Sequence, residues 1–264
     1  MKHTLYVLWS YIYFYCKAAA FFKLNFMLSN ITNSVHQVLG VVFIVTVFNY
    51  IPAAEHWGYY ECLFLQGFAN LVIVAFHMFF SGYTNFASKY LYSKKYDIVL
   101  MRPISSLLQV LAENISLDRI PNAVLAFTIM CYAYVHIDIH INIFIMILIL
   151  LLYLVLNLVI LACICILLTS ISFSLNMRVN VFVPLMNVFE FTRYPFVLYG
   201  KIISIFFTFA IPLASVAYFP VGYVLRKIAN PLVLVLPFIH ALVLVPITQK
   251  VWRRQELKYT GVSI

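Results

Sequence analysis

The sequence predicts an all-α membrane protein with about six transmembrane helices, on the evidence of its composition and its hydropathy pattern. Of the 264 residues, 65% are hydrophobic and only 9% are charged, and the mean hydropathy is +1.00. A water-soluble domain carries about a quarter charged residues and does not hide so much apolar surface. Several apolar blocks also exceed the roughly 20 residues that cross a bilayer as a helix. We therefore expect residues 1–264 to form a single transmembrane domain in lipid.

The expected spans follow one another through short connections. They cover 26–51, 57–83, 121–137, 141–172, 200–219 and 231–249. The third is short, and the fourth is long enough to tilt or to extend past the bilayer. Pro212 and Pro237 fall inside the last two spans, where a lost helix hydrogen bond allows a kink or re-entrant geometry.

The charged residues predict the orientation of these spans. All but two of the 17 Lys and Arg residues fall on one side, and only Arg226 and Lys227 fall on the other. The positive-inside rule then places both termini in the cytoplasm. Because the charges lie between apolar blocks, we expect no nucleic-acid partner. Abundant Ile, Asn, Lys, Phe and Tyr with few Gly indicate an AT-rich bacterial genome, and hence the bacterial cytoplasmic membrane.

The N-terminal segment 1–25 is interrupted by charges and rich in aromatic residues. Trp and Tyr favour the headgroup layer of a membrane, so we expect an interfacial amphipathic helix on the cytoplasmic leaflet. A seventh span is the alternative, and it would place the N-terminus outside the cell.

Two expected spans each carry a narrow stripe of polar or small residues. The first stripe is Ser29, Asn33, His36 and Gly40, and the second is Gln66, Asn70, His77 and Ser81. At 100° per residue each set lies on one helix face. Such stripes either join neighbouring helices through hydrogen bonds and close packing, or line a translocation pathway or subunit interface.

Several kinds of chemistry are not indicated. His136, Asp138 and His140 on the short turn between spans three and four are expected to be a solvated cap, and we predict no metal site. No HExxH motif or mid-membrane carboxylate pair suggests catalytic residues. The sequence has no GxxxxGK[ST] phosphate loop, so we expect no cofactor on this chain. Energy for any transport would come from a partner or a gradient.

The longest polar stretch, 84–118, is a candidate docking element. Pro103 suits the first turn of a helix, and the residues after it read as a short amphipathic helix on the cytoplasmic surface. A plain surface helix fits the pattern equally well. The sequence YDIVLMRPISSLLQ at 96–109 is similar to the signature loop of a branch of ABC type-2 permeases. Two further stretches, Arg193-Tyr194-Pro195 and, within the tail 250–264, Trp252-Arg253-Arg254, resemble the same family in order and spacing.

This resemblance implies the permease subunit of an ATP-driven exporter. It implies two cytoplasmic ABC ATPase subunits, which bind ATP and Mg, and a second identical or paralogous permease. The loop after span two would supply the coupling helix, and the coupling candidates are Tyr96, Asp97, Arg102, Pro103, Ser105 and Gln109. The substrate would be hydrophobic or amphipathic, such as a drug, lipid or antimicrobial peptide. The alternatives are a membrane immunity protein that binds without turnover and an ion-coupled carrier.

Overall fold

The computed structural model describes residues 23–50, 57–84, 86–91, 93, 95–112, 115, 117–139, 141–175 and 182–259. Within these ranges the chain consists of helices and their connections, without a β-strand, and the all-α prediction is confirmed. The interfacial helix expected at 1–25 lies almost wholly outside the described residues, and so does the end of the tail, 260–264.

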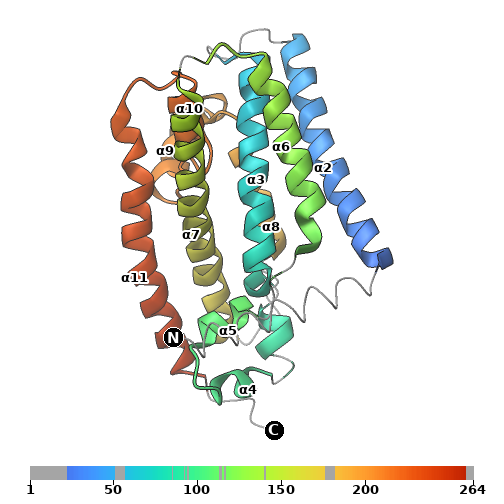
Figure 1. The fold of residues 1–264 in the computed structure, drawn as a ribbon. Helices are drawn as coiled ribbons and strands as arrows, with labels where there is room; N and C mark the ends of the chain where they lie inside the picture. The colour runs from blue at the N-terminus through green and yellow to red at the C-terminus, as the bar shows by residue number, and fades with distance from the viewer. Residues whose placement is uncertain are drawn as a thin grey trace.

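Long apolar helices form a bundle, shown in Figure 1. They are α2 (Lys23–Tyr50), α3 (Tyr59–Thr84), α7 (Ile143–Leu175) and α11 (Leu236–Glu256). Over the described residues, four helices are long and apolar enough to cross a membrane, and they correspond to α2, α3, α7 and α11. The expected third span corresponds to α6 (Ile120–Val135), which is apolar but only 16 residues long.

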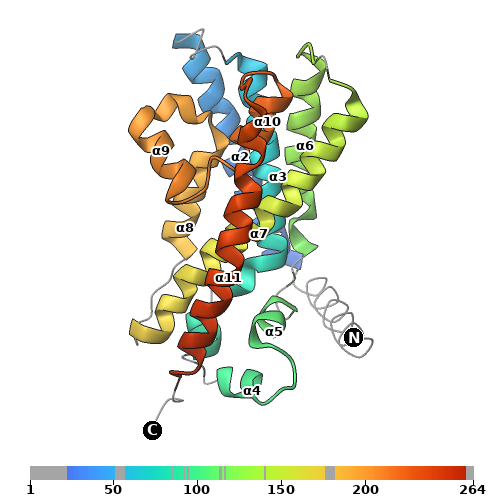
Figure 2. The same ribbon diagram turned by 90° about the vertical axis from the view of Figure 1, so that its left-hand side faces the viewer.

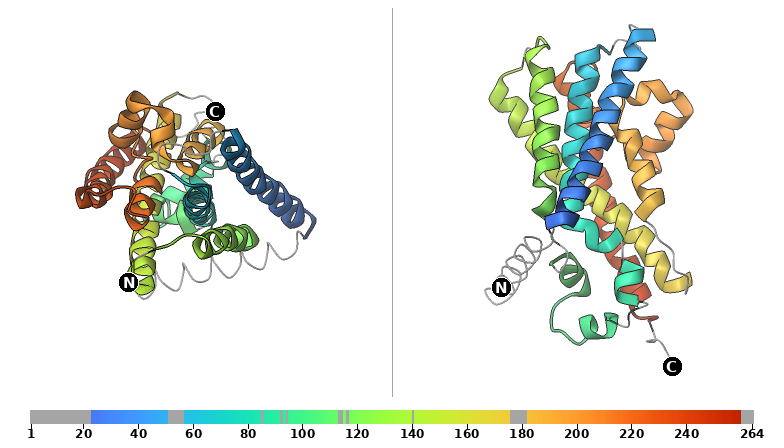
Figure 3. Two further views of the ribbon diagram at one scale, coloured as in Figure 1. Left: turned by 90° about the horizontal axis from the view of Figure 1, so that it is seen from above. Right: turned by 90° about the vertical axis from the view of Figure 1, so that its right-hand side faces the viewer.

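Helix α3 is the centre of the bundle, and α2 is at its edge. The most apolar stretch of α3 is 72% buried, against 17% for α2. Helix α3 packs against α6, α7, α2 and α10. At Gly67 of α3 the backbone of α6 comes so close that a Cβ would lie 2.9 Å from the Met130 nitrogen. Viewed from above in Figure 3, α2 stands at one side of the other helices.

Hydrogen bonds attach α2 to α6. The side chains of Asn30, Ser34 and Gln37 follow one face of α2 and meet Asn122 near the start of α6. The Asn122 amide donates to Oδ1 of Asn30 at 2.6 Å, and its own Oδ1 accepts from Ser34 at 3.1 Å. Inter-helix hydrogen bonds of this kind are an ordinary means of packing helices in lipid. This second polar face of α2 is separate from the stripe predicted on that helix.

The fifth expected span, 200–219, is interrupted near Pro212, where the sequence allowed a kink or re-entrant geometry. The chain passes through several short helices after α7. They are α8 (Phe182–Phe189), η3 (Glu190–Arg193), η4 (Phe196–Tyr199), α9 (Lys201–Phe209) and α10 (Tyr218–Val224). In Figure 2, α8 and α9 lie beside the long helices, with α9 farther from α4 and α5 than α8 is.

The break follows from Pro212, and hydrogen bonds to α7 and α11 hold the unwound segment. Proline has no N–H for the helix ladder, and the helix ends at Phe209. The carbonyl of buried Val216 accepts a hydrogen bond from Asn157 of α7 at 2.7 Å. Ser215 lies 2.9 Å from Nδ1 of His240 on α11. Irregular backbone is tolerated at membrane depth where protein buries it in this way.

The sixth expected span is η5 (Pro231–Leu234) followed by α11. Asn230 caps η5 by accepting a hydrogen bond from the Leu232 nitrogen at 2.9 Å. Pro237 lies in the first turn of α11, where its missing N–H costs no intrahelical hydrogen bond. Pro246 is the proline inside this helix.

Short helices gather at one end of the bundle (Figure 2). They include α4 (Tyr96–Leu100) and α5 (Ser106–Ala112), with η1 (Ala87–Leu91) leading in and η2 (Leu117–Arg119) leading out. Pro103 was expected in the first turn of a helix, but it lies in the bend between α4 and α5. Ser105 instead precedes α5, and its hydroxyl accepts a hydrogen bond from the Leu108 nitrogen at 3.3 Å, as an N-cap does.

Candidate functional site

The two predicted stripes face one another for part of their length. Where Gly40 meets α3, the absent side chain leaves room for Gln66, since a Cβ on Gly40 would overlap Nε2 of Gln66. This Nε2 donates to the backbone carbonyl of Gln37 at 3.2 Å. Gly40 and Gln66 therefore join the helices, which is the packing interpretation of the stripes.

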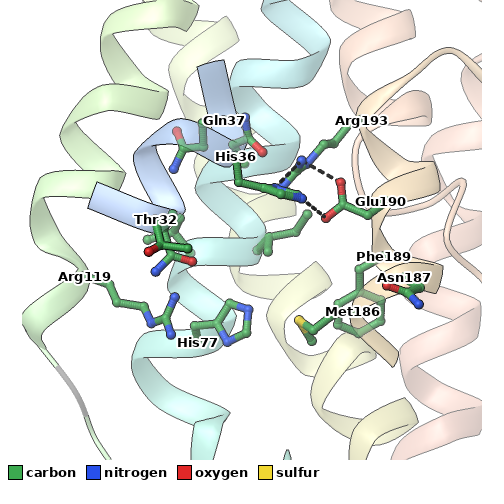
Figure 4. Close-up of a pocket in the computed structure, with 14 residues that line it drawn as sticks. Thr32, His36, Gln37, His77, Arg119, Met186, Asn187, Phe189, Glu190 and Arg193 are labelled. Atoms are coloured by element: carbon green, nitrogen blue, oxygen red, sulfur yellow. Dashed lines mark hydrogen bonds and ion pairs between the residues drawn. The ribbon is translucent and has the colours of Figure 1, made fainter. Parts of the chain in front are cut away.

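Farther along, the stripes separate around a pocket of about 230 Å³, which we call the polar pocket. Its walls come from α2, α3, η2 and the α8–η3 segment, as Figure 4 shows. Four stripe residues line it: Asn33, His36, Asn70 and His77. Ser29 and Ser81 lie outside its lining. Ser29 accepts a hydrogen bond from Asn33 at 2.6 Å through its carbonyl, and the carbonyl of Ser81 accepts one from Thr84.

An ion pair forms one wall of the polar pocket. Nη1 of Arg193 lies 2.5 Å from Oε2 of Glu190 and 3.0 Å from Nδ1 of His36. Arginine has donors only, so Nδ1 of His36 accepts and the ring proton belongs on Nε2, which faces Glu190 at 3.9 Å. Figure 4 shows the three side chains meeting between α2 and η3.

Other buried polar groups in the polar pocket lack protein partners. Asn70 is 1% exposed, and neither its Nδ2 nor its Oδ1 has a partner in the described structure. The Nε of Arg193 is likewise buried without one. The Arg119 guanidinium also lines the pocket, next to Asp118. Burial lowers the pKa of Arg119, while the charge of nearby Asp118 opposes that shift. A buried polar group without a partner costs about 1–3 kcal/mol, so a ligand that supplied one would be favoured.

Sequence reasoning missed the charged half of this pocket. Arg193 was assigned to a cytoplasmic loop, yet it is 6% exposed and packed in the bundle. Glu190 and Arg119 were not considered as pocket residues. The sequence signal for these residues was the Arg-Tyr-Pro motif at 193–195. It was identified as part of the family resemblance but was given no role. The span prediction began the fifth crossing at 200 and so left α8 and η3 outside it.

The coupling candidates divide into exposed and buried residues. Asp97, Arg102, Pro103 and Ser105 are exposed, next to Met101, which is 77% exposed. Tyr96 and Gln109 point inward and are almost fully buried.

Gln109 holds the bend between α4 and α5 in shape. Its Nε2 lies 2.9 Å from the Val99 carbonyl and 2.7 Å from the Ile104 carbonyl. These two contacts span the exposed residues 100–103, so Gln109 fixes the exposed tip rather than forming part of its surface.

Aromatic side chains fasten α4 and α5 to the long helices. We call this cluster the aromatic clasp, and it consists of Phe86, Tyr90, Tyr96, Phe173, Trp252 and Tyr259. Ring centroids within it are 5.0 to 6.2 Å apart, in the range of favourable aromatic pairs.

Tyr96 and Trp252 of the aromatic clasp have hydrogen-bond partners. The Tyr96 hydroxyl donates to Oε1 of Glu256 at 2.7 Å, and Nε1 of Trp252 donates to the Ser106 hydroxyl at 3.0 Å. Burial raises the pKa of the Tyr96 phenol, and the Glu256 carboxylate raises it further. Tyr96 therefore remains a hydrogen-bond donor at physiological pH.

No metal centre is indicated by the described side chains, which contain no group of three or more His, Cys, Asp and Glu able to hold an ion. At the turn after α6, His136 stacks on Tyr60 at 4.5 Å between ring centroids. His140 lies outside the described residues.

Comparisons with known proteins agree with this architecture. A family model described as ABC-2 family transporter protein matches residues 34–263, which is most of the chain. No curated protein and no solved structure gave a match. The matched region contains α3 to α11, the polar pocket's α3 and η3 walls, and the α4–α5 end. The chain is therefore a multi-pass membrane protein that belongs to the ABC-2 transporter family, as the permease subunit of an ABC transporter.

Proposed function

We propose that this chain is the permease of an ATP-driven exporter, which moves a hydrophobic or amphipathic substrate out of the cell by alternating access. Drugs, lipids and antimicrobial peptides are the candidate substrates. The observation that carries the proposal is the family match over 34–263, combined with a polar pocket between α2, α3 and η3. Asn33, His36, Asn70 and His77 line that pocket, so the stripes serve as a pathway there and as packing at Gly40 and Gln66.

The energy source in this proposal is an ABC ATPase, which family membership implies as a partner. We propose two such subunits, carrying ATP and Mg, and a second permease that is identical or paralogous. The exposed tip between α4 and α5 would dock on the ATPase through Asp97, Arg102, Pro103 and Ser105. Tyr96 and Gln109 would act indirectly, because they hold that tip against α11 and in its bent shape.

The proposed orientation places the α4–α5 end and both termini in the cytoplasm of a bacterial cell. The excess of Lys and Arg on that side supports it. Burial of Arg193 removes one charge from the predicted count but leaves the asymmetry large.

Copurification with the cognate ATPase tests the coupling role. Charge reversal at the exposed tip, Arg102→Glu with Asp97→Arg, should reduce recovery of the ATPase about tenfold or more, because the tip is exposed and charged. The control is Arg226→Glu, an exposed arginine near Lys227, whose ion pair with Glu61 lies at the opposite end of α3. Full recovery of the complex with both tip residues reversed would contradict the coupling role.

Transport in inverted membrane vesicles separates the proposal from its alternatives. Export requires ATP and stops with a catalytically inactive ATPase. An immunity protein that binds without turnover would still protect cells under that condition. An ion-coupled carrier would transport on a gradient without nucleotide.

A further inference from the structure

The polar pocket carries more positive than negative charge. Two guanidinium groups, Arg119 and Arg193, line it with one carboxylate, Glu190. Glu190 already pairs with Arg193 at 2.5 Å. The negative charge that acts on Arg119 is that of Asp118, its neighbour in sequence, which lies outside the pocket lining, so the lining itself carries one more positive than negative charge. An anion is the natural partner for a partly buried guanidinium, especially one that presents paired oxygen atoms.

Buried hydrogen-bond donors beside Arg119 lack an acceptor among the described residues. Nδ2 of Asn70 and Nε of Arg193 are both buried and lack acceptors in the described structure. Asn70 belongs to α3, the most buried helix, and its side chain lines the pocket. A ligand with several acceptor oxygens would satisfy atoms that the protein itself leaves unpaired, which is where a polar ligand gains most.

The same pocket also has apolar walls. Ile73 and Val74 line it from α3, and Met186 and Phe189 line it from α8. On α2 the apolar residues beside the lining, Ile31 and Val35, are 56% and 53% exposed. A hydrocarbon tail could therefore lie along α2 while its head group occupies the pocket.

We infer that the polar pocket binds the anionic head group, a phosphate or carboxylate, of an amphipathic molecule whose tail lies along α2. Arg119 provides a positive charge and Asn70 a buried donor. This inference deepens the proposed function and rests on it only in treating the pocket as part of the substrate route.

Binding to the full chain in phosphatidylcholine nanodiscs tests the inference without any ATPase. The probes are octyl phosphate, octyltrimethylammonium and inorganic phosphate, each titrated by calorimetry with empty nanodiscs subtracted. Octyl phosphate should bind, and the other two should bind at least about tenfold more weakly. Equal binding of the cationic probe would overturn the anion preference. Equal binding of inorganic phosphate would overturn the amphipathic ligand and indicate a free-anion site.

Matched variants locate the binding. Arg119→Gln should weaken octyl phosphate about tenfold, because a charged hydrogen bond is lost. Arg226→Gln makes the same change at an exposed arginine near the opposite end of α3 and should leave binding unchanged. Asn70→Leu, which keeps the side-chain volume, should weaken binding as well. Wild-type affinity in both pocket variants would overturn the assignment to this pocket.

Addition of phosphatidylglycerol to the nanodisc distinguishes the source of the anion. Competition with octyl phosphate would support the inferred chemistry and identify a membrane lipid as an occupant. Loss of ATPase copurification would bear on the proposed function alone, because these titrations need no partner.

Discussion

The aromatic clasp and the polar pocket each bring early and late parts of the chain together, and they differ in how their most buried polar side chains are paired. In the aromatic clasp, the Tyr96 hydroxyl and the Trp252 nitrogen each have a partner within 3.0 Å, although the Tyr259 hydroxyl does not among the described residues. In the polar pocket, Asn70 is as deeply buried and has none in the described structure. A buried polar group without a partner calls for an explanation, such as a ligand or a water molecule. The paired atoms of the clasp hold it together, and under the proposed function the unpaired amide of Asn70 faces a ligand.

The difference also suits a transporter mechanically. A docking element must transmit motion, and Tyr96 fastens α4 directly to the end of α11. A substrate site must change its surroundings between states, and α2 is held at the bundle edge by amide hydrogen bonds such as those of Asn122. An element with few buried apolar contacts moves at a low cost in free energy.

Truncation of Trp252 tests whether the aromatic clasp is a rigid unit, and it has the largest expected effect on stability. Trp252 is 2% exposed and contacts Tyr83, Phe86 and Phe173. Trp252→Ala should lower the free energy of unfolding by about 3–5 kcal/mol, because a large cavity forms at the clasp. Thermal unfolding in nanodiscs measures this, and ATPase recovery should fall with it. Trp252→Phe keeps most of the packing and serves as the control. An alanine variant as stable as the phenylalanine one would mean that the clasp is not a rigid unit.

Removal of one hydroxyl tests whether polar partners matter in the aromatic clasp. Tyr96→Phe leaves the ring contacts with Phe86 and Phe173 but deprives Glu256 of its donor. We expect a loss of about 1.5 kcal/mol in unfolding free energy, the value for a hydrogen bond to a charged acceptor. Tyr50→Phe, at a tyrosine 83% exposed, should change nothing measurable. Equal stability of the two variants would show that the hydroxyl of Tyr96 contributes no net energy.

Sequence patterns predicted the helices better than they predicted the site. The long apolar runs of α2, α3, α7 and α11 leave no alternative in lipid, since a helix satisfies its own backbone. Pro212 signals a break in the fifth span, but the way its unwound backbone is held depends on Asn157, which lies 59 residues before Val216. No local pattern contains such a contact.

The stripes predicted half of the polar pocket for a similar reason. Helical periodicity places Asn33 with His36, and Asn70 with His77, each pair on one face of its own helix. Glu190 and Arg193 come from a short irregular segment with no apolar periodicity, and only the folded chain brings them to His36. The sequence motif likewise identified the six coupling candidates but not their roles. Only the fold shows that Tyr96 and Gln109 are buried while the other four are exposed.

Substitution of Asn70 has the smallest expected effect on stability and separates the two regions most sharply. Asn70→Leu removes polar atoms that have no protein partner, so the free energy of unfolding should stay constant or rise by up to about 1 kcal/mol. The matched change is Asn157→Leu on α7, where an equally buried amide donates to the Val216 carbonyl at 2.7 Å. That variant should lose about 1–3 kcal/mol, because it leaves a buried carbonyl without its donor. Chemical denaturation of both variants without added ligand gives the comparison. If Asn70→Leu were destabilised as much as Asn157→Leu, Asn70 would be a structural amide, and the polar pocket would resemble the clasp after all.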